Sequence, residues 1–169
     1  MDGSELMSHE RESRRGVAHA GSLARLDLDV IAASSANVCI LISGPGSPQG
    51  VARRIHGLTR ARQGRFLAVD CGWPEALLDQ QLFHAIRPGS SGTVFLEEIG
   101  RLSPELQDRL LQTLDAPPDP RGPRAPRARV MASTSEALVQ RALEGSFNDR
   151  LFYRLNAIHV VIPPDLEEW

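Results

Sequence analysis

Three polar elements of this sequence, each placed at the end of an apolar run, have the residue types of a phosphate-handling site. The stretch GPGSPQG covers residues 44–50, the acidic pair Glu97-Glu98 ends a second run, and Thr134-Ser135 ends a third. Glycine-rich loops offer backbone N–H groups to phosphates, and carboxylates can hold a divalent metal or act as a base. The sequence therefore suggests phosphate chemistry, provided that these elements meet in space.

The elements around them predict how they would meet. Continuous apolar runs that suit strands buried on both faces lie at 37–43, 65–71, 93–97, 128–134 and 157–162. Amphipathic stretches that suit helices lie at 21–34, 48–62, 74–86, 104–114, 136–144 and 148–156. The alternation predicts an α/β fold with a five-stranded parallel sheet flanked by helices. Ligands of such sheets bind beyond the carboxyl ends of the strands, where all three polar elements fall.

The glycine-rich loop has some but not all features of a phosphate cradle. Its candidate contacts with a bound cofactor are Gly44, Gly46, Ser47, Gln49 and Gly50. Pro45 and Pro48 each remove an N–H donor from the loop. No lysine is present to supply charge, because all 19 basic residues are arginine. We therefore expect weak or no phosphate binding.

Composition sets the outer limits of the interpretation. The chain has 169 residues, a formal net charge of −2 and 41% hydrophobic residues, which suits one globular domain and argues against a protein that coats nucleic acid. We expect a disordered lead-in over 1–18 and a single α/β core over 19–169. Cys39 and Cys71 lack metal-ligand spacing, so we expect buried, reduced thiols and a cytoplasmic protein with no membrane segment.

Segment 115–129 is rich in proline and arginine and predicts a surface loop that carries Arg121, Arg124, Arg127 and Arg129. One interpretation is a solvated linker. The other is a contact loop for an acidic or phosphate-bearing partner.

Four blocks carry a family resemblance, and they follow one another in the family's order. They are FLAVDCGWPEALLDQQLF at 66–83, SGTVFLEEIGRLSPELQDRLLQTLD at 91–115, RVMASTSEAL at 129–138 and GSFNDRLFYRLNAIHVVIPP at 145–164. From about residue 20 to 164 the chain resembles the AAA+ ATPase domain of sigma-54-dependent bacterial transcription activators, in a degenerate and shortened form. The resemblance implies a P-loop NTPase-like core, a helical lid after it, assembly into rings, and hydrolysis of ATP with Mg²⁺ to remodel RNA polymerase that carries sigma-54.

The resemblance also implies roles for particular residues. Glu97 stands at the metal-orienting position and Glu98 at that of the catalytic base. Thr134 and Ser135 stand at the positions that sense the nucleotide. Arg154 matches an arginine that reaches the ATP of a neighbouring subunit, although a structural salt bridge would explain it equally well.

Glu98, Thr134 and Arg154 match the residue types of the family, whereas other positions differ. Glu97 replaces an aspartate, Ser135 replaces an asparagine, and Asn148 stands where the family has a first arginine. The GAFTGA loop, which contacts sigma-54 in the family, is absent between QLFH at 81–84 and the strand at 93–97. The chain ends at IPPDLEEW, so we also expect no helical lid and no DNA-binding domain.

Three functions remain open at this stage. The favoured hypothesis is a regulator of transcription that has weak or lost ATP binding and acts through protein contacts, with AAA+ protomers of its own kind or of a full-length activator as partners. The missing GAFTGA loop argues against a contact with sigma-54, and we expect no direct DNA binding. The alternatives are an ATP-hydrolysing transcription factor with a modified pocket, and a functionless remnant with a stable fold.

Overall fold

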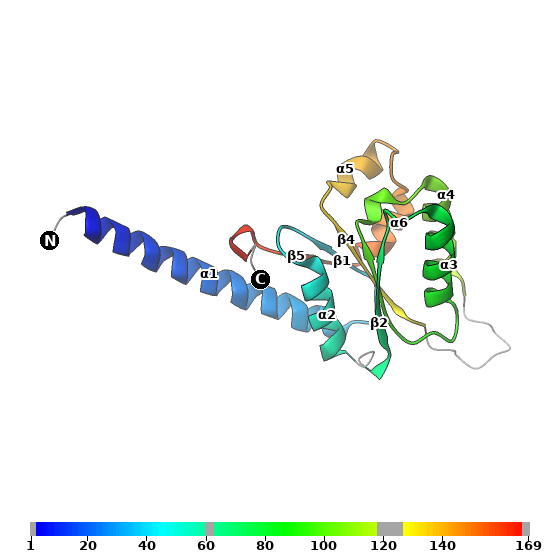
Figure 1. The fold of residues 1–169 in the computed structure, drawn as a ribbon, viewed down its shortest axis with the longest axis horizontal. Coiled ribbons are helices and arrows are strands. Elements are labelled where there is room, and N and C mark those ends of the chain that lie inside the picture. Colours follow the sequence, from blue (N-terminus) through cyan, green and yellow to red (C-terminus); the bar gives the residue numbers. More distant parts are fainter. Residues whose placement is uncertain (1–2, 60–62, 118–126, 167–169) are drawn as a thin grey trace.

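The computed structural model describes residues 3–59, 63–117 and 127–166, with side chains described from Gly16 onward. Its centre is a sheet of five parallel strands in the order β2-β3-β4-β1-β5 (Figure 1). The strands are β1 Ile40–Ser43, β2 Arg65–Asp70, β3 Gly92–Glu97, β4 Arg129–Thr134 and β5 Ile158–Val161. The α/β fold predicted from the alternation of apolar runs and amphipathic stretches is confirmed.

Helices cover both faces of the sheet. The α-helices are α1 Gly3–Ser35, α2 Pro48–Leu58, α3 Glu75–Ile86, α4 Pro104–Asp115, α5 Leu138–Leu143 and α6 Asp149–Leu155, and short 3-10 helices span η2 Ile99–Arg101 and η3 Pro164–Leu166. α1 and α2 pack on one face, and α3, α4 and α6 lie on the other (Figure 1). None of the helices within the described ranges is long and apolar enough to cross a membrane.

Cap residues fix where several helices begin. Ser47 and Ser103 precede a proline at the first helical position, and each side chain accepts a hydrogen bond from a backbone N–H in the first turn. Asn148 caps α6 with its side chain, which accepts the N–H of Leu151. Such caps satisfy N–H groups that the helix itself leaves free, which contributes about 1 kcal/mol each.

Helix α1 begins earlier than the sequence predicts. It takes in residues 3–18, which were expected to form most of a disordered lead-in, and its N-terminal part projects away from the body (Figure 1). The segment contains no proline and several residues of high helix propensity, which favour a helix. Its polar and charged composition had indicated disorder instead. The division of the chain at residue 18 stays a prediction.

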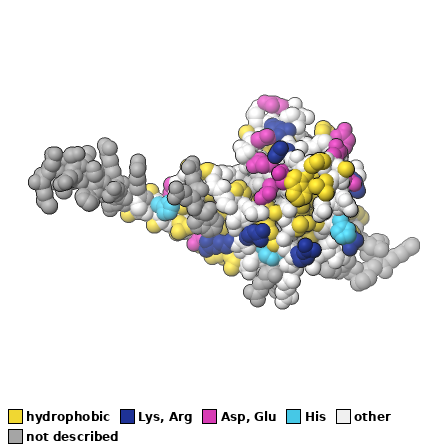
Figure 2. Space-filling model, viewed as in Figure 1, with side chains coloured by type: hydrophobic (Ala, Val, Ile, Leu, Met, Phe, Trp, Pro, Cys, Tyr) yellow, Lys and Arg dark blue, Asp and Glu magenta, His cyan; other side chains and the backbone are white. Residues whose placement is uncertain are grey.

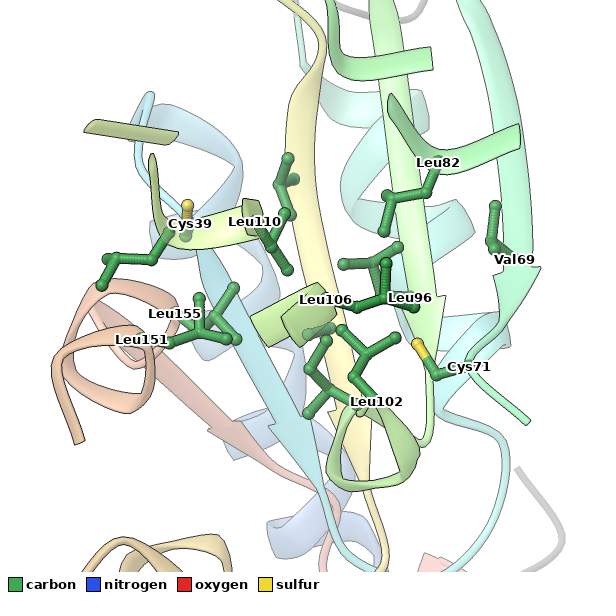
Figure 3. Packing of buried hydrophobic residues seen from close by; sticks show 14 of the residues in the cluster. Cys39, Val69, Cys71, Leu82, Leu96, Leu102, Leu106, Leu110, Leu151 and Leu155 are labelled. Carbon is green, nitrogen blue, oxygen red and sulfur yellow. The ribbon is translucent and has the colours of Figure 1, made fainter. Parts of the chain in front are cut away.

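Two apolar clusters hold the layers together, one on each face of the sheet. The larger cluster lies under α3, α4 and α6 and includes Leu96, Leu106, Leu110 and Leu151 (Figure 3). The smaller one joins α1 and α2 to the other side of β1, β3, β4 and β5. Successive residues of β1, β3 and β4 alternate between the two clusters, which explains why the central strands are apolar on both faces.

The arginine-rich segment divides between two environments. Arg129 is the first residue of β4 and is only 6% exposed, so its predicted place on a surface loop was wrong. Pairing with β1 and β3 draws this end of the segment into the sheet. Arg127 is exposed as predicted, whereas Arg121 and Arg124 lie outside the described residues.

Candidate functional site

The three polar elements do meet at the carboxyl edge of the sheet, which is the edge where the parallel strands end. A hollow of about 260 Å³ lies there, lined by Pro48, Gln49, Asp70, Phe95, Glu97, Glu98, Arg101 and Ser133. Figure 2 shows acidic side chains gathered on the upper part of the body, toward this edge. Of the predicted residues, Gln49, Glu97 and Glu98 line the hollow directly.

The glycine-rich loop is tightly folded against the sheet. Gly44 and Gly46 adopt φ angles of +105° and +91°, which favour glycine. A Cβ atom at Gly44 would lie 2.3 Å from the carbonyl oxygen of Ile162, so only glycine fits beside β5. The N–H of Gly50 donates to Ser47 Oγ at 3.0 Å. This cap uses a donor that a bound phosphate would otherwise receive, in addition to the two donors that Pro45 and Pro48 lack.

Glu98 is held in an unusual conformation by the turn after β4. Its φ of +52° and ψ of +58° make it the one non-glycine residue with positive φ among the described residues. Its Oε2 accepts hydrogen bonds from Ser135 N at 3.0 Å and from Ser135 Oγ at 2.9 Å. A left-handed glutamate costs about 1–2 kcal/mol, a strain that is typical of functional sites. The structure therefore brings the predicted pair Glu98 and Ser135 into direct contact.

Thr134 has a local structural role instead. Its Oγ1 accepts a hydrogen bond from Glu136 N at 3.0 Å and donates to Glu136 O at 3.2 Å, closing the turn that follows β4. The residue is 4% exposed and does not line the hollow.

Asp70 and Arg101 belong to the site although the sequence reasoning missed them. Arg101 Nη1 lies 3.6 Å from Asp70 Oδ1, which also accepts the N–H of Gly72 at 2.7 Å. A Cβ atom on Gly72 would meet the Arg101 guanidinium at 2.2 Å, so glycine is needed for this arginine to lie where it does. Their positions in the sequence could have indicated both residues. Asp70 lies near the end of an apolar run at the same edge, and Arg101 closely follows the acidic pair.

Negative charge dominates the hollow. Burial raises the pKa of Glu97, and the neighbouring Asp70 and Glu98 raise it further, against a smaller opposing effect of Arg53. Arg101 is the only cationic side chain among the described residues that line the hollow. Within the described ranges, no group of three or more histidine, cysteine, aspartate or glutamate side chains is arranged to hold a metal ion. Mg²⁺ is usually bound by one or two carboxylates together with water and phosphate oxygens, and Glu97 and Glu98 are the carboxylates that line this hollow beside Asp70.

Arg154 lies far from the hollow, at the opposite end of the sheet. Its Nε donates to Asp115 Oδ1 at 3.1 Å and its Nη2 to the carbonyl oxygen of Leu114 at 3.2 Å. Arg150 approaches the same carboxylate at 3.8 Å. Within one chain Arg154 therefore makes a structural salt bridge, which is one of the two roles expected for it.

A parallel sheet with a glycine-rich loop between β1 and a helix, and an acidic pair at the end of β3, defines a P-loop NTPase-like core. The sigma-54 interaction domain family matches residues 84–161, and that part of the chain belongs to the family. The resemblance predicted from the sequence is thereby confirmed.

Known proteins support the same assignment. The sigma-54-dependent transcriptional activator SfnR of Pseudomonas putida is 34% identical over 157 residues, which cover 81% of this chain and 43% of the relative. The P-loop NTPase domain of the sigma-54 transport activator from E. coli superposes with a TM-score of 0.56 at 21% identity, over 97% of this chain and 99% of that one. NtrX from Brucella abortus, solved in complex with ATP, gives a TM-score of 0.69 at 23% identity, over 84% of this chain and 37% of that one.

The matched region is only part of most relatives. The chain spans between 20% and 43% of the length of eight curated relatives that it matches. The similarity to these relatives therefore concerns the shared core domain.

Proposed function

We propose that this chain regulates transcription as a degenerate AAA+ domain of the sigma-54-activator type, with weakened or lost binding of ATP and Mg²⁺, and that it acts through protein contacts. The observation that carries the proposal is the phosphate loop. Pro45 and Pro48 have no N–H to offer, the N–H of Gly50 is used by Ser47, and no lysine is present in the chain. A helix N-terminus alone attracts an anion with only about 0.3–1 kcal/mol.

The charge of the hollow points the same way. Asp70, Glu97 and Glu98 face a single guanidinium, that of Arg101. An approaching triphosphate would meet a surplus of negative charge without a metal ion to offset it. Burial raises the pKa of Glu97, and the nearby carboxylates of Asp70 and Glu98 raise it further.

The proposed partners are AAA+ protomers, either copies of this chain or a full-length activator. Several relatives are named as sigma-54-dependent regulators. In this chain, however, α3 ends at Ile86 and β3 begins at Gly92, so only residues 87–91 connect these two elements. This connection has no room for the GAFTGA loop, which argues against a sigma-54 contact. We further propose a cytoplasmic protein with no direct contact to DNA.

A second function has one specific observation in its favour. Glu98 keeps a strained conformation that Ser135 supports, as a residue retained for catalysis would. In this alternative Glu98 is the base, Glu97 holds Mg²⁺, Thr134 and Ser135 sense the nucleotide, and Arg154 acts on a neighbouring subunit. The phosphates would then bind at Gly44, Gly46, Ser47, Gln49 and Gly50. A stable remnant without activity is the third alternative.

Calorimetric titration of the pure chain with ATP and MgCl₂, beside ADP, tests the proposal. We expect no heat of binding up to roughly millimolar nucleotide. A micromolar dissociation constant, about −8 kcal/mol, would contradict the proposal and favour the ATPase. Phosphate release that Glu98→Gln abolishes would then establish hydrolysis, with Glu144→Gln as a control at an exposed glutamate elsewhere.

A further inference from the structure

A larger cavity lies at the amino edge of the sheet, which is the edge where the strands begin. Its volume is about 650 Å³, and it lies where β1 and β4 begin and where α3, α4 and α6 end. Among the described residues, three arginines line it, Arg127, Arg129 and Arg154, against the single carboxylate of Asp115. We refer to it as the amino-edge cavity.

Arg129 has hydrogen-bonding capacity that the described residues do not satisfy. It is 6% exposed, and its Nη2 donates to the carbonyl oxygen of Ala33 at 2.5 Å. Its Nε is buried and has no hydrogen-bond partner among the described residues. Burial also lowers the pKa of this arginine. Because an unpaired buried donor is costly, an acceptor that reached this guanidinium would be bound favourably.

The other two arginines could share the same ligand. Among the described residues, Arg127 makes two hydrogen bonds, both long, to the carbonyl oxygens of Thr113 and Pro117 at 3.4 and 3.5 Å, so it can exchange them for a better acceptor. Arg154 shares Asp115 with Arg150, which leaves the cavity with a surplus of positive charge. Guanidinium groups bind carboxylates and phosphates in preference to neutral acceptors.

The remaining walls are partly apolar, with the polar residues Asn37 and Thr113 among them. Val38, Ile86, Leu114 and Val130 line the cavity beside the thiol of Cys39. Small-molecule sites in proteins combine such apolar walls with a few placed polar groups, in volumes of roughly 300–1,000 Å³. An anion with an apolar body would use both kinds of lining, whereas a bare inorganic ion would leave the apolar walls without a contact.

We propose that the amino-edge cavity is a binding site for a small organic anion, whose carboxylate is held by Arg127, Arg129 and Arg154 and whose apolar part lies against Val38 and Val130. The site is separate from the hollow at the carboxyl edge and goes beyond the proposed function. It stands whether or not ATP binds at that hollow.

Two-dimensional ¹H–¹⁵N NMR of the full chain tests the proposal with benzoate as the probe. We expect saturable shifts at the amides of Val38, Cys39 and Val130 at roughly millimolar benzoate. The neutral isostere benzamide should bind at least tenfold more weakly, because it lacks the charge that the arginines recognise. Inorganic phosphate should also bind more weakly, because it lacks the apolar body.

Variants locate the site. Arg127→Gln and Arg154→Gln should each weaken benzoate binding about tenfold, whereas Arg87→Gln, an exposed arginine that does not line the cavity, should leave it unchanged. Arg127 is exposed, so its replacement should not disturb folding. Absence of shifts at these amides, equal binding of benzamide, or equal weakening by Arg87→Gln would each overturn the proposal, and phosphate binding as tight as benzoate would refute its organic ligand class.

Discussion

The two edges of one sheet carry opposite charge. At the carboxyl edge, Asp70, Glu97 and Glu98 line with one guanidinium the hollow where the resemblance led us to expect a phosphate-bearing ligand. At the amino edge, Arg127, Arg129 and Arg154 surround one carboxylate in a cavity more than twice as large. The comparison shows that a core can keep its strands and helices while the charges suited to an anion lie at the edge opposite to the expected one. Each prediction below tests the packing or the charge at one of these edges.

The largest effect is expected from Gly44→Ala at the carboxyl edge. The new Cβ would lie 2.3 Å from the carbonyl oxygen of Ile162, at a φ of +105°. Backbone strain and a clash with β5 together should lower the free energy of unfolding by about 3 kcal/mol. Urea denaturation measures this change.

Gly89→Ala is the matched control for Gly44→Ala. Gly89 has a similar φ of +89°, but nothing lies within 4 Å of a Cβ atom there. Gly89→Ala should lower the free energy of unfolding by only about 1 kcal/mol, which is the cost of the backbone conformation alone. Equal losses in the two variants would show that the loop does not pack against β5 as described.

The two cysteines report the charge at each edge. Burial raises the pKa of Cys71 to about 12, with further increases from Asp70, Glu97 and Glu98. Burial also raises the pKa of Cys39, but there Arg154 and Arg129 lower it in part. Cys71 thus lies near the carboxylates of the carboxyl edge, and Cys39 near the arginines of the amino edge.

We therefore expect charged thiol reagents to discriminate between the cysteines. In single-cysteine variants, Cys71→Ser and Cys39→Ser, the ratio of rates for an anionic over a cationic methanethiosulfonate should be about tenfold higher at Cys39 than at Cys71. Mass spectrometry of quenched samples gives both rates. Equal ratios at the two thiols would remove the contrast between the edges.

A smaller effect is expected from Asp115→Asn at the amino edge. The carboxylate pairs with Arg154 at 3.1 Å and Arg150 at 3.8 Å, all with side chains more than 40% exposed. Exposed pairs contribute little, so stability should fall by about 0.5–1 kcal/mol at low salt and by less at high salt. Asp29→Asn, at an exposed position of α1, removes the same charge elsewhere and should change stability less. Benzoate binding should tighten in Asp115→Asn, because the cavity loses its one carboxylate.

Much of the fold could be predicted from the sequence, because buried parallel strands require continuous apolar runs. The run at 65–71 matches β2 at Arg65–Asp70, and Ser103 with Pro104 marks the start of α4. The helical form of residues 3–18 could not be predicted, because polar composition suits both a disordered tail and a projecting helix.

The site could be predicted only as far as strand order dictates it. The glycine-rich loop and the acidic pair meet because each lies at the end of a parallel strand, and these strands all end at the same edge of the sheet. The contacts of Glu98 with Ser135, and of Arg101 with Asp70, depend on side-chain directions that no spacing encodes. The position of Arg154 at the far edge likewise follows from where α6 ends, and its partner Asp115 comes from another helix.

The smallest effect concerns the pH dependence of stability, through Glu97. Burial, Asp70 and Glu98 raise the pKa of this carboxyl group in the folded chain above its ordinary 4.5. Between 4.5 and the folded pKa, the folded state holds more protons than the unfolded state, so the free energy of unfolding falls as pH rises through this window. Above the window, Glu97 lowers the free energy of unfolding by a constant amount, and below pH 4.5 it has no such effect.

Glu97→Gln should therefore be slightly more stable than the parent at pH 7 and lose that advantage in acid, as urea denaturation across pH would measure. Glu105→Gln, an exposed glutamate on α4, is the control and should show no such gain. If Glu97→Gln were less stable than the parent at pH 7, burial and the neighbouring carboxylates would not disfavour the charge of Glu97. The surplus of negative charge inferred for the carboxyl edge would then be contradicted.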